Sequence, residues 1–197
     1  MNRAEWGNLA TLTLKDPAQA AQDILALRLE RNVLWLAFAL AVVLNTAAQV
    51  LSDMMLSNLT GELPVLALPP LAYAGFFTGA ILLFVSVLSF IGPKMGGSGR
   101  FNDVFVLIIW LQYLRFVLEL VVLILLLVAP VFGALIGIAG SLVGLYIMVH
   151  FIDQAHRLNS LGQSVLLLLV SIIAMAVVLY FFLSLAGGPI VGSATFV

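Results

Sequence analysis

Five long apolar stretches dominate this sequence and decide what it can fold into. They cover residues 33–51, 71–91, 104–128, 131–152 and 165–185. A helix needs about 20 apolar residues to cross the hydrocarbon core of a bilayer. None of the stretches alternates apolar and polar residues as a barrel strand does, so only helices can satisfy their backbone hydrogen bonds in hydrocarbon. The sequence therefore predicts an all-α polytopic membrane protein, a bundle of five transmembrane helices.

The composition excludes the main soluble alternatives. Charged residues make up 9% of the 197 residues and hydrophobic residues 63%, whereas a typical soluble domain is about 25% charged. A soluble protein could not cover its surface with so few charges. The net charge of −1 also excludes a basic nucleic-acid binder, and the lack of cysteine excludes a disulfide scaffold.

Lysine and arginine are distributed unevenly between the loops. Seven of the eight precede the first stretch or follow the second or fourth: Arg3, Lys15, Arg28, Arg31, Lys94, Arg100 and Arg157. The positive-inside rule then places the N-terminus in the cytoplasm and the C-terminus outside. We expect a cytoplasmic segment (1–32), a five-helix transmembrane domain (33–185) and an external tail (186–197).

The cytoplasmic segment contains a predicted amphipathic helix that begins at Asp16 and Pro17, an N-cap residue followed by proline at the first helical position. Its apolar face carries Pro17, Ala20, Ala21, Ile24 and Leu27. Such a helix either lies in the membrane interface or docks on the cytoplasmic ends of the spans. Both placements keep it close to the membrane.

Polar residues recur within two of the predicted spans. Gln112, Arg115 and Glu119 share one face of the third span, and Asn45 and Gln49 lie at a similar depth in the first. A charge near the bilayer centre costs at least about 2.5 kcal/mol, so it must face the bundle interior or a wet cavity. We predict one polar cluster between the two spans. It is either a site for a substrate, ion or headgroup, or an Arg115–Glu119 pair that fixes helix packing.

Small residues mark the predicted helix contacts. The fourth span contains Gly133 and Gly137, then Gly140 and Gly144, each pair four residues apart, and the second span has small residues around Gly75. This spacing allows close approach of two helix backbones. We expect these faces to pack helices of the chain against one another.

Two cytoplasmic segments supply further candidate contact residues. Gly97, Ser98 and Arg100 belong to a glycine-rich turn that lacks the spacing of a nucleotide P-loop. This turn is either an anion or lipid-phosphate contact or a plain connector. The remaining candidates lie at the end of the fourth span: His150, Asp153, His156 and Arg157. Their spacing is not that of a zinc helix, so we predict no metal and no cofactor.

The order of these features resembles the Yip domain family, five-span membrane proteins related to the Ypt/Rab-interacting proteins. Four features carry the resemblance: the Leu14-Lys15-Asp16-Pro17 helix start, the five spans after a cytoplasmic N-terminus, the turn 96–101, and the segment 156–160. The resemblance covers about residues 14–185. It implies a bacterial member in the cytoplasmic (inner) membrane, with no catalytic residues to transfer.

These observations favour a non-enzymatic membrane scaffold or accessory subunit. The expected partners are membrane lipids and another membrane protein or further copies of the chain, and no nucleic acid. The alternative is a transporter of a small solute, ion or lipid that uses the Arg115/Glu119 cluster. An enzyme is the weakest class, because no nucleophile in the spans has an adjacent base.

Overall fold

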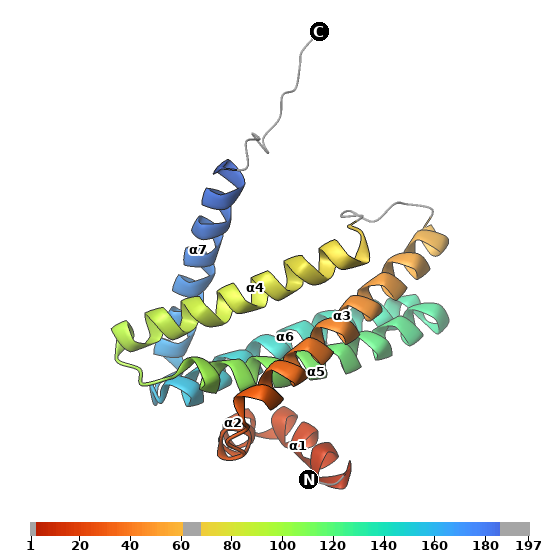
Figure 1. The fold of residues 1–197 in the computed structure, drawn as a ribbon. Helices are drawn as coiled ribbons and strands as arrows, with labels where there is room; N and C mark the ends of the chain where they lie inside the picture. The colour runs from red at the N-terminus through yellow and green to blue at the C-terminus, as the bar shows by residue number, and fades with distance from the viewer. Residues whose placement is uncertain (1–2, 61–67, 186–197) are drawn as a thin grey trace.

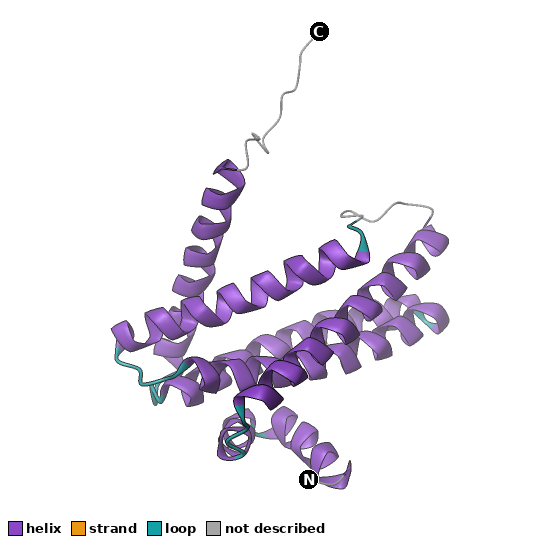
Figure 2. Ribbon diagram, in the orientation of Figure 1, coloured by secondary structure: helices purple, strands orange, loops and turns teal. Residues whose placement is uncertain are grey.

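The structure, a computed structural model, describes residues 3–60 and 68–185, and every regular element in that part of the chain is helical (Figures 1 and 2). The elements are α1 (Arg3–Lys15), α2 (Pro17–Ala26), α3 (Arg31–Thr60), α4 (Pro70–Ile91), the 3₁₀-helix η1 (Gly92–Met95), α5 (Phe101–Val128), α6 (Pro130–His156) and α7 (Leu161–Leu185). The predicted external tail (186–197) lies outside the described residues.

Five of the described helices, α3 to α7, are long and apolar enough to cross a membrane. This confirms the predicted fold class, an all-α polytopic bundle. The helices extend beyond the apolar stretches, because helical hydrogen bonds continue through polar residues. The helix α3 starts at Arg31 and runs on to Thr60, and α6 continues to His156.

The helices α5 and α6 form an antiparallel hairpin, α3 and α4 pack against α5, and α7 contacts α6 and extends away from the hairpin (Figure 1). Ala129 separates the two helices, and Pro130 occupies the first turn of α6. The helix α3 packs along α5, and α4 contacts α3, α5 and α7. The largest fully buried side chains gather near the end of the bundle where α5 begins and α6 ends. They include Leu88, Phe105, Leu107, Phe151, Ile152 and Leu167.

Glycines let α6 approach α5 closely. A Cβ added at Gly133 would lie 2.9 Å from the backbone nitrogen of Leu126, and one at Gly140 would meet the Leu118 side chain. At Gly144 a Cβ would meet nothing within 4 Å, and the same holds for Gly75 in α4. The small-residue prediction therefore holds within the chain for part of α6, and α4 uses other residues for its contacts.

The helix α2 has the predicted apolar face and docks on the ends of other helices. Pro17, Ala20, Ala21 and Ile24 are buried, and α2 packs against α6 and α5. The carboxylate of Asp16 accepts a hydrogen bond from the backbone N–H of Gln19 at 3.0 Å, as an N-cap residue does. Of the two placements, the structure adopts the docked one.

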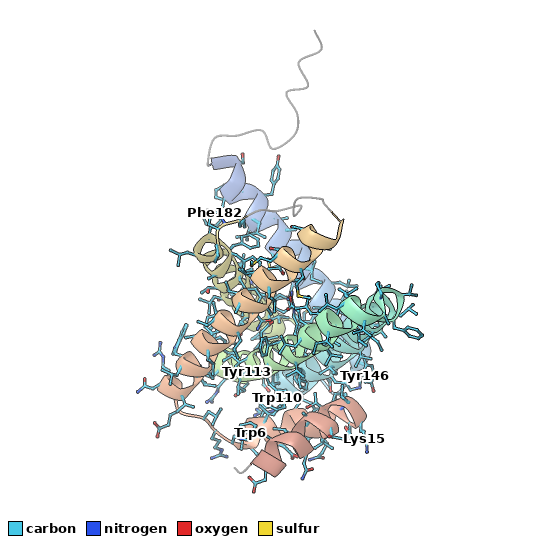
Figure 3. All side chains as sticks on the ribbon, turned by 90° about the vertical axis from the view of Figure 1, so that its right-hand side faces the viewer. Trp6, Lys15, Trp110, Tyr113, Tyr146 and Phe182 are labelled. Carbon is cyan, nitrogen blue, oxygen red and sulfur yellow. The ribbon has the colours of Figure 1, made fainter. Side chains whose placement is uncertain are left out.

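The helix α1 was not predicted. The indole of Trp6 stacks on that of Trp110 in α5, with 5.8 Å between ring centroids (Figure 3). The Trp110 Nε1–H donates to Thr13 Oγ1 at 3.0 Å, and Thr13 is fully buried. The segment has no strong apolar face, so its sequence pattern does not indicate this helix. The helix packs mainly against α2, and the two contacts with Trp110 join it to α5.

The close contact between α5 and α6 predicts different effects for two similar substitutions. We expect Gly133→Ala to lower the free energy of unfolding by about 1–3 kcal/mol, because its methyl group would press on the α5 backbone. Gly144→Ala should have no destabilising effect, because its Cβ enters open space. Thermal unfolding in a mild detergent measures both. Equal midpoints for the two variants would contradict the packing.

Candidate functional site

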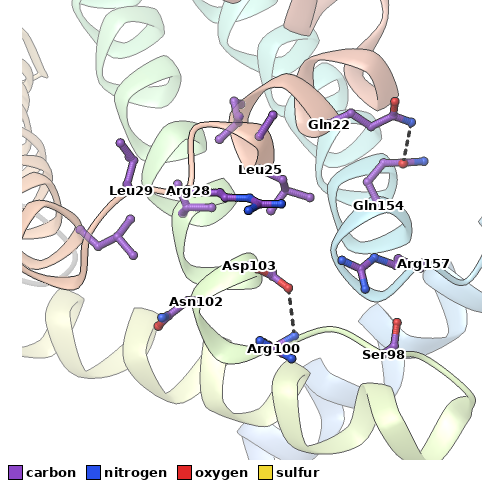
Figure 4. A pocket seen from close by; sticks show the side chains of 14 residues that line it. Gln22, Leu25, Arg28, Leu29, Ser98, Arg100, Asn102, Asp103, Gln154 and Arg157 are labelled. Carbon is purple, nitrogen blue, oxygen red and sulfur yellow. Dashed lines mark hydrogen bonds between the residues drawn. The ribbon is translucent and has the colours of Figure 1, made fainter.

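Three arginines from separate segments line one pocket, which we call the arginine pocket (Figure 4). Arg28 follows α2, Arg100 precedes α5 and Arg157 follows α6, around a cavity of about 1060 Å³. Neutral polar side chains and one carboxylate complete the polar lining: Gln22, Ser98, Asn102, Gln154 and Asp103. Apolar side chains line the rest of the pocket, among them Ile24, Leu25, Leu29, Leu34 and Val106.

The ends of three helices determine the positions of the three arginines. Arg157 is the C-cap of α6 in the left-handed conformation, with φ 54°, and its N–H donates to the carbonyl of Asp153. Arg28 is also left-handed, with φ 43°. A left-handed residue with a Cβ costs about 1–2 kcal/mol, except that asparagine and aspartate tolerate it better. Two arginines of this pocket thus occupy a costly backbone conformation.

The charges in the arginine pocket are unequal. Three guanidinium groups face one carboxylate, and Asp103 Oδ2 accepts a hydrogen bond from the backbone N–H of Arg100 at 3.4 Å. Within residues 3–60 and 68–185, no ion pair is recorded for Arg28, Arg100 or Arg157. The pocket therefore has a surplus of positive charge that the described part of the chain does not neutralise.

A hydrogen bond between two helices closes one side of the pocket. Gln22 in α2 donates through Nε2 to Gln154 Oε1 in α6 at 3.0 Å. This bond and the buried face of α2 hold the α2–α3 connection, and hence Arg28, beside the end of α6 (Figure 4). The sequence analysis missed Arg28 and the two glutamines as lining residues, because no local pattern links them.

The 3₁₀-helix η1 and the glycine-rich turn that follows it pack around the ring of His156, which is completely buried. A Cβ added at Gly92 would collide with the imidazole, and one at Gly99 would lie 2.7 Å from the imidazole Cδ2. The ring nitrogens lie 3.2 Å from the carbonyl oxygens of Ile152 and Leu88, and Ser98 N–H donates to the His156 carbonyl at 2.8 Å. Close packing accounts for these glycines.

The other predicted contact residues divide between the pocket and the helix ends. Ser98, Arg100 and Arg157 line the arginine pocket, whereas a Cβ at Gly97 would lie 2.9 Å from the Cβ of His156. His156 lies beneath the turn.

Asp153 closes the connection from α6 to α7. Its Oδ1 accepts hydrogen bonds from Ser160 N–H at 2.9 Å and Ser164 Oγ at 3.2 Å. His150 contacts Tyr146 of its own helix, through the carbonyl at 3.0 Å and the ring at 4.3 Å between centroids. In the described ranges, no group of three or more acidic, histidine or cysteine side chains could hold a metal ion.

One residue of the predicted intramembrane cluster, Asn45, joins α3 to α5, through the backbone of Gln112 and not through its side chain. Asn45 is 2% exposed and donates through Nδ2 to the carbonyls of Ala41 at 2.8 Å and Gln112 at 3.3 Å. Gln49 donates to Asp53 Oδ1 one turn further along α3, at 2.8 Å. The side-chain oxygens Asn45 Oδ1 and Gln112 Oε1 are buried with no hydrogen-bond partner.

Arg115 and Glu119 follow Gln112 along α5, and no salt bridge joins these two residues within the described part of the chain. The Arg115 guanidinium is 5.9 Å from the centroid of the Phe77 ring in α4. Gln112 and Arg115 line a groove of about 800 Å³ whose other lining residues are almost all apolar or small.

The comparison with protein families decides the family. The family model described as the Yip1 domain matches residues 11–182, which is most of the chain. The chain belongs to the Yip1 domain family. The match includes α2, the glycine-rich turn of this Yip1 domain and its five long helices. Searches of curated proteins and of solved structures found no match to it.

The contact between Gly92 and His156 predicts a rescue in this Yip1 domain. Gly92→Ala should lower the free energy of unfolding by about 1–3 kcal/mol, because its methyl group and the imidazole compete for the same space. In a His156→Ala background the same change should cost much less, since the three atoms nearest the added Cβ all belong to the histidine ring.

Thermal unfolding of the two single variants and the double variant in mild detergent measures the coupling. Gly162→Ala is the matched control, because the nearest atom to its added Cβ is Ser160 Oγ at 4.0 Å. Additive effects of the two changes would show that the turn does not depend on this contact.

Proposed function

We propose that this membrane protein is a non-enzymatic scaffold or accessory subunit that binds another membrane protein or lipids. The observation that carries the proposal is the outer half of α7, which extends away from the other helices (Figure 1). The buried residues of α7 lie in its first half, for example Leu167 and Ser171. In the second half, Val177 is 62% exposed and Tyr180 74%.

The described chain leaves this surface of α7 exposed, so in a membrane it contacts either lipid or another protein. Lipid tails are as apolar as leucine, so they cover this surface without any cost, and a partner helix covers it by close packing. Large aromatic side chains such as Tyr180, Phe181 and Phe182 provide extensive contact area for such packing.

Photocrosslinking from α7 tests the binding role. A photoreactive amino acid at Tyr180 should yield a covalent adduct with another membrane protein of defined mass, and the same protein should co-purify in mild detergent. Leu142 on α6 is the control, because its side chain is similarly exposed at 65% but lies on a different helix. A chain that purifies without protein or lipid, or equal adducts from both positions, would contradict the proposal.

We place the protein in the bacterial cytoplasmic (inner) membrane with its N-terminus inside and its C-terminus outside. The seven basic residues that precede the first apolar stretch or follow the second or fourth support this orientation. The same orientation puts the arginine pocket and the glycine-rich turn on the cytoplasmic side.

A second candidate function is transport of a small solute, ion or lipid. Buried Asn45 Oδ1 and Gln112 Oε1 favour it, because each unsatisfied buried acceptor costs about 1–3 kcal/mol and a passing donor or cation would satisfy it. The apolar lining of the groove at Gln112 and Arg115 argues for a dry cluster instead. The scaffold therefore has the stronger support.

Single cysteines test the orientation and the transport route together, since the native chain contains no cysteine. We expect a membrane-impermeant maleimide to label Leu68→Cys in intact cells and to label Ser98→Cys only after permeabilisation. Both positions are exposed and lie at opposite ends of α4. The reverse pattern would invert the orientation.

The same reagent distinguishes a dry cluster from a water-filled route. In the scaffold, Gln112→Cys should remain unlabelled from either side, like Leu142→Cys on an exposed apolar face of α6. Labelling of Gln112→Cys alone would favour the transporter.

A further inference from the structure

The arginine pocket has the charge of an anion site. Arg28, Arg100 and Arg157 bring three positive charges to one cavity, and the one carboxylate, Asp103, already accepts from the Arg100 backbone. No ion pair of these arginines is recorded in the described ranges. The first turn of α5, a helix of 28 residues, adds the partial positive charge of a helix N-terminus beside Arg100.

The donors in this pocket suit a phosphate group. Each guanidinium offers a rigid fork of N–H groups that matches two oxygens of a phosphate. Ser98 and Asn102 add neutral hydrogen-bonding side chains at the same lining. All three cationic lining residues are arginine, so the pocket favours bidentate contacts over single point charges.

The pocket is also larger than a phosphate ion needs. Its volume of about 1060 Å³ slightly exceeds the range of about 300–1,000 Å³ that is usual for small-molecule sites. Three apolar side chains form a wall beside the arginines: Leu25 on α2, Leu34 near the start of α3, and Val106 near the start of α5. A ligand with an anionic head and an apolar body fits this pairing of surfaces better than a small ion does.

We infer that the arginine pocket binds the phosphate group of an anionic phospholipid at the membrane surface. The inference rests on the proposed function and specifies the class of lipid that the protein binds. Anionic lipids are concentrated in cytoplasmic leaflets, and basic pockets between helix ends on that side are suited to bind their headgroups. The left-handed backbones of Arg28 and Arg157 help to set where these two guanidinium groups enter the pocket.

Native mass spectrometry of the full chain in mild detergent tests the inference. Phosphatidylglycerol should bind more tightly than phosphatidylcholine with the same acyl chains. The double change Arg28→Asn and Arg157→Asn should weaken phosphatidylglycerol binding by at least about tenfold, because it removes two charged contacts. Asparagine suits the left-handed conformation of both positions, so the fold should be retained.

The control removes the same charge from the same side of the chain. Lys15→Asn with Lys94→Asn changes two residues that do not line the pocket. Phosphatidylglycerol binding should persist in this variant. Equal weakening in both double variants, or no preference for phosphatidylglycerol in the native chain, would overturn the inference.

Two further arms keep the result interpretable. Arg100→Gln, at an extended backbone position with φ −100°, replaces the asparagine variant if that one fails to fold. A titration with inorganic phosphate, read as a thermal shift, separates the sources. Arginine-dependent stabilisation by phosphate with no arginine-dependent lipid binding would overturn the lipid in favour of a soluble phosphate ligand. A chain that binds phosphatidylglycerol but captures no protein through α7 would contradict the protein-binding role alone.

Discussion

The enclosure of His156 by the glycine-rich turn is the contact on which the rest of the structure depends. Its ring nitrogens lie near carbonyl oxygens of α4 and α6, and Gly92 and Gly99 leave the room that the ring occupies. Asp153, less than one turn earlier, holds the start of α7. The ends of four long helices thus meet at one face of the bundle, and the outer half of α7 extends freely from it (Figure 1).

Some polar groups inside the bundle have hydrogen-bond partners on neighbouring helices, whereas the charged groups of the arginine pocket do not form ion pairs within the described chain. Between α3 and α5, Asn45 donates to the Gln112 carbonyl and Tyr113 OH donates to the Ala37 carbonyl at 2.7 Å, so these polar groups hold helices together. In the arginine pocket, the guanidinium groups have no recorded ion pair in the described chain. Groups without an internal partner are available to a ligand, which is why the proposed lipid site lies at the helix ends.

Features that depend on neighbouring residues were predictable. The five long helices follow from apolar runs, and the buried face of α2 follows from its helical period and the Asp16 cap. The similar depth of Asn45 and Gln112 was predictable, but the bond between them runs to the Gln112 backbone carbonyl, and the side-chain oxygens of both residues have no hydrogen-bond partner. The helix α1 was not predictable, because it has no strong apolar face of its own and its side-chain contacts with α5 join Trp6 and Thr13 to Trp110, which is far away in sequence.

The amino-acid sequence alone determined the solvent of this protein, its helical architecture and the side on which its basic residues gather, because these follow from local apolarity and charge. It did not reveal why glycines surround His156, because the side chain that would collide with a Cβ at these positions belongs to another helix. Nor did it group Arg28 with Arg100 and Arg157. That grouping arises when α2 docks on α6, and such a contact depends on the packing of surfaces that are distant along the chain.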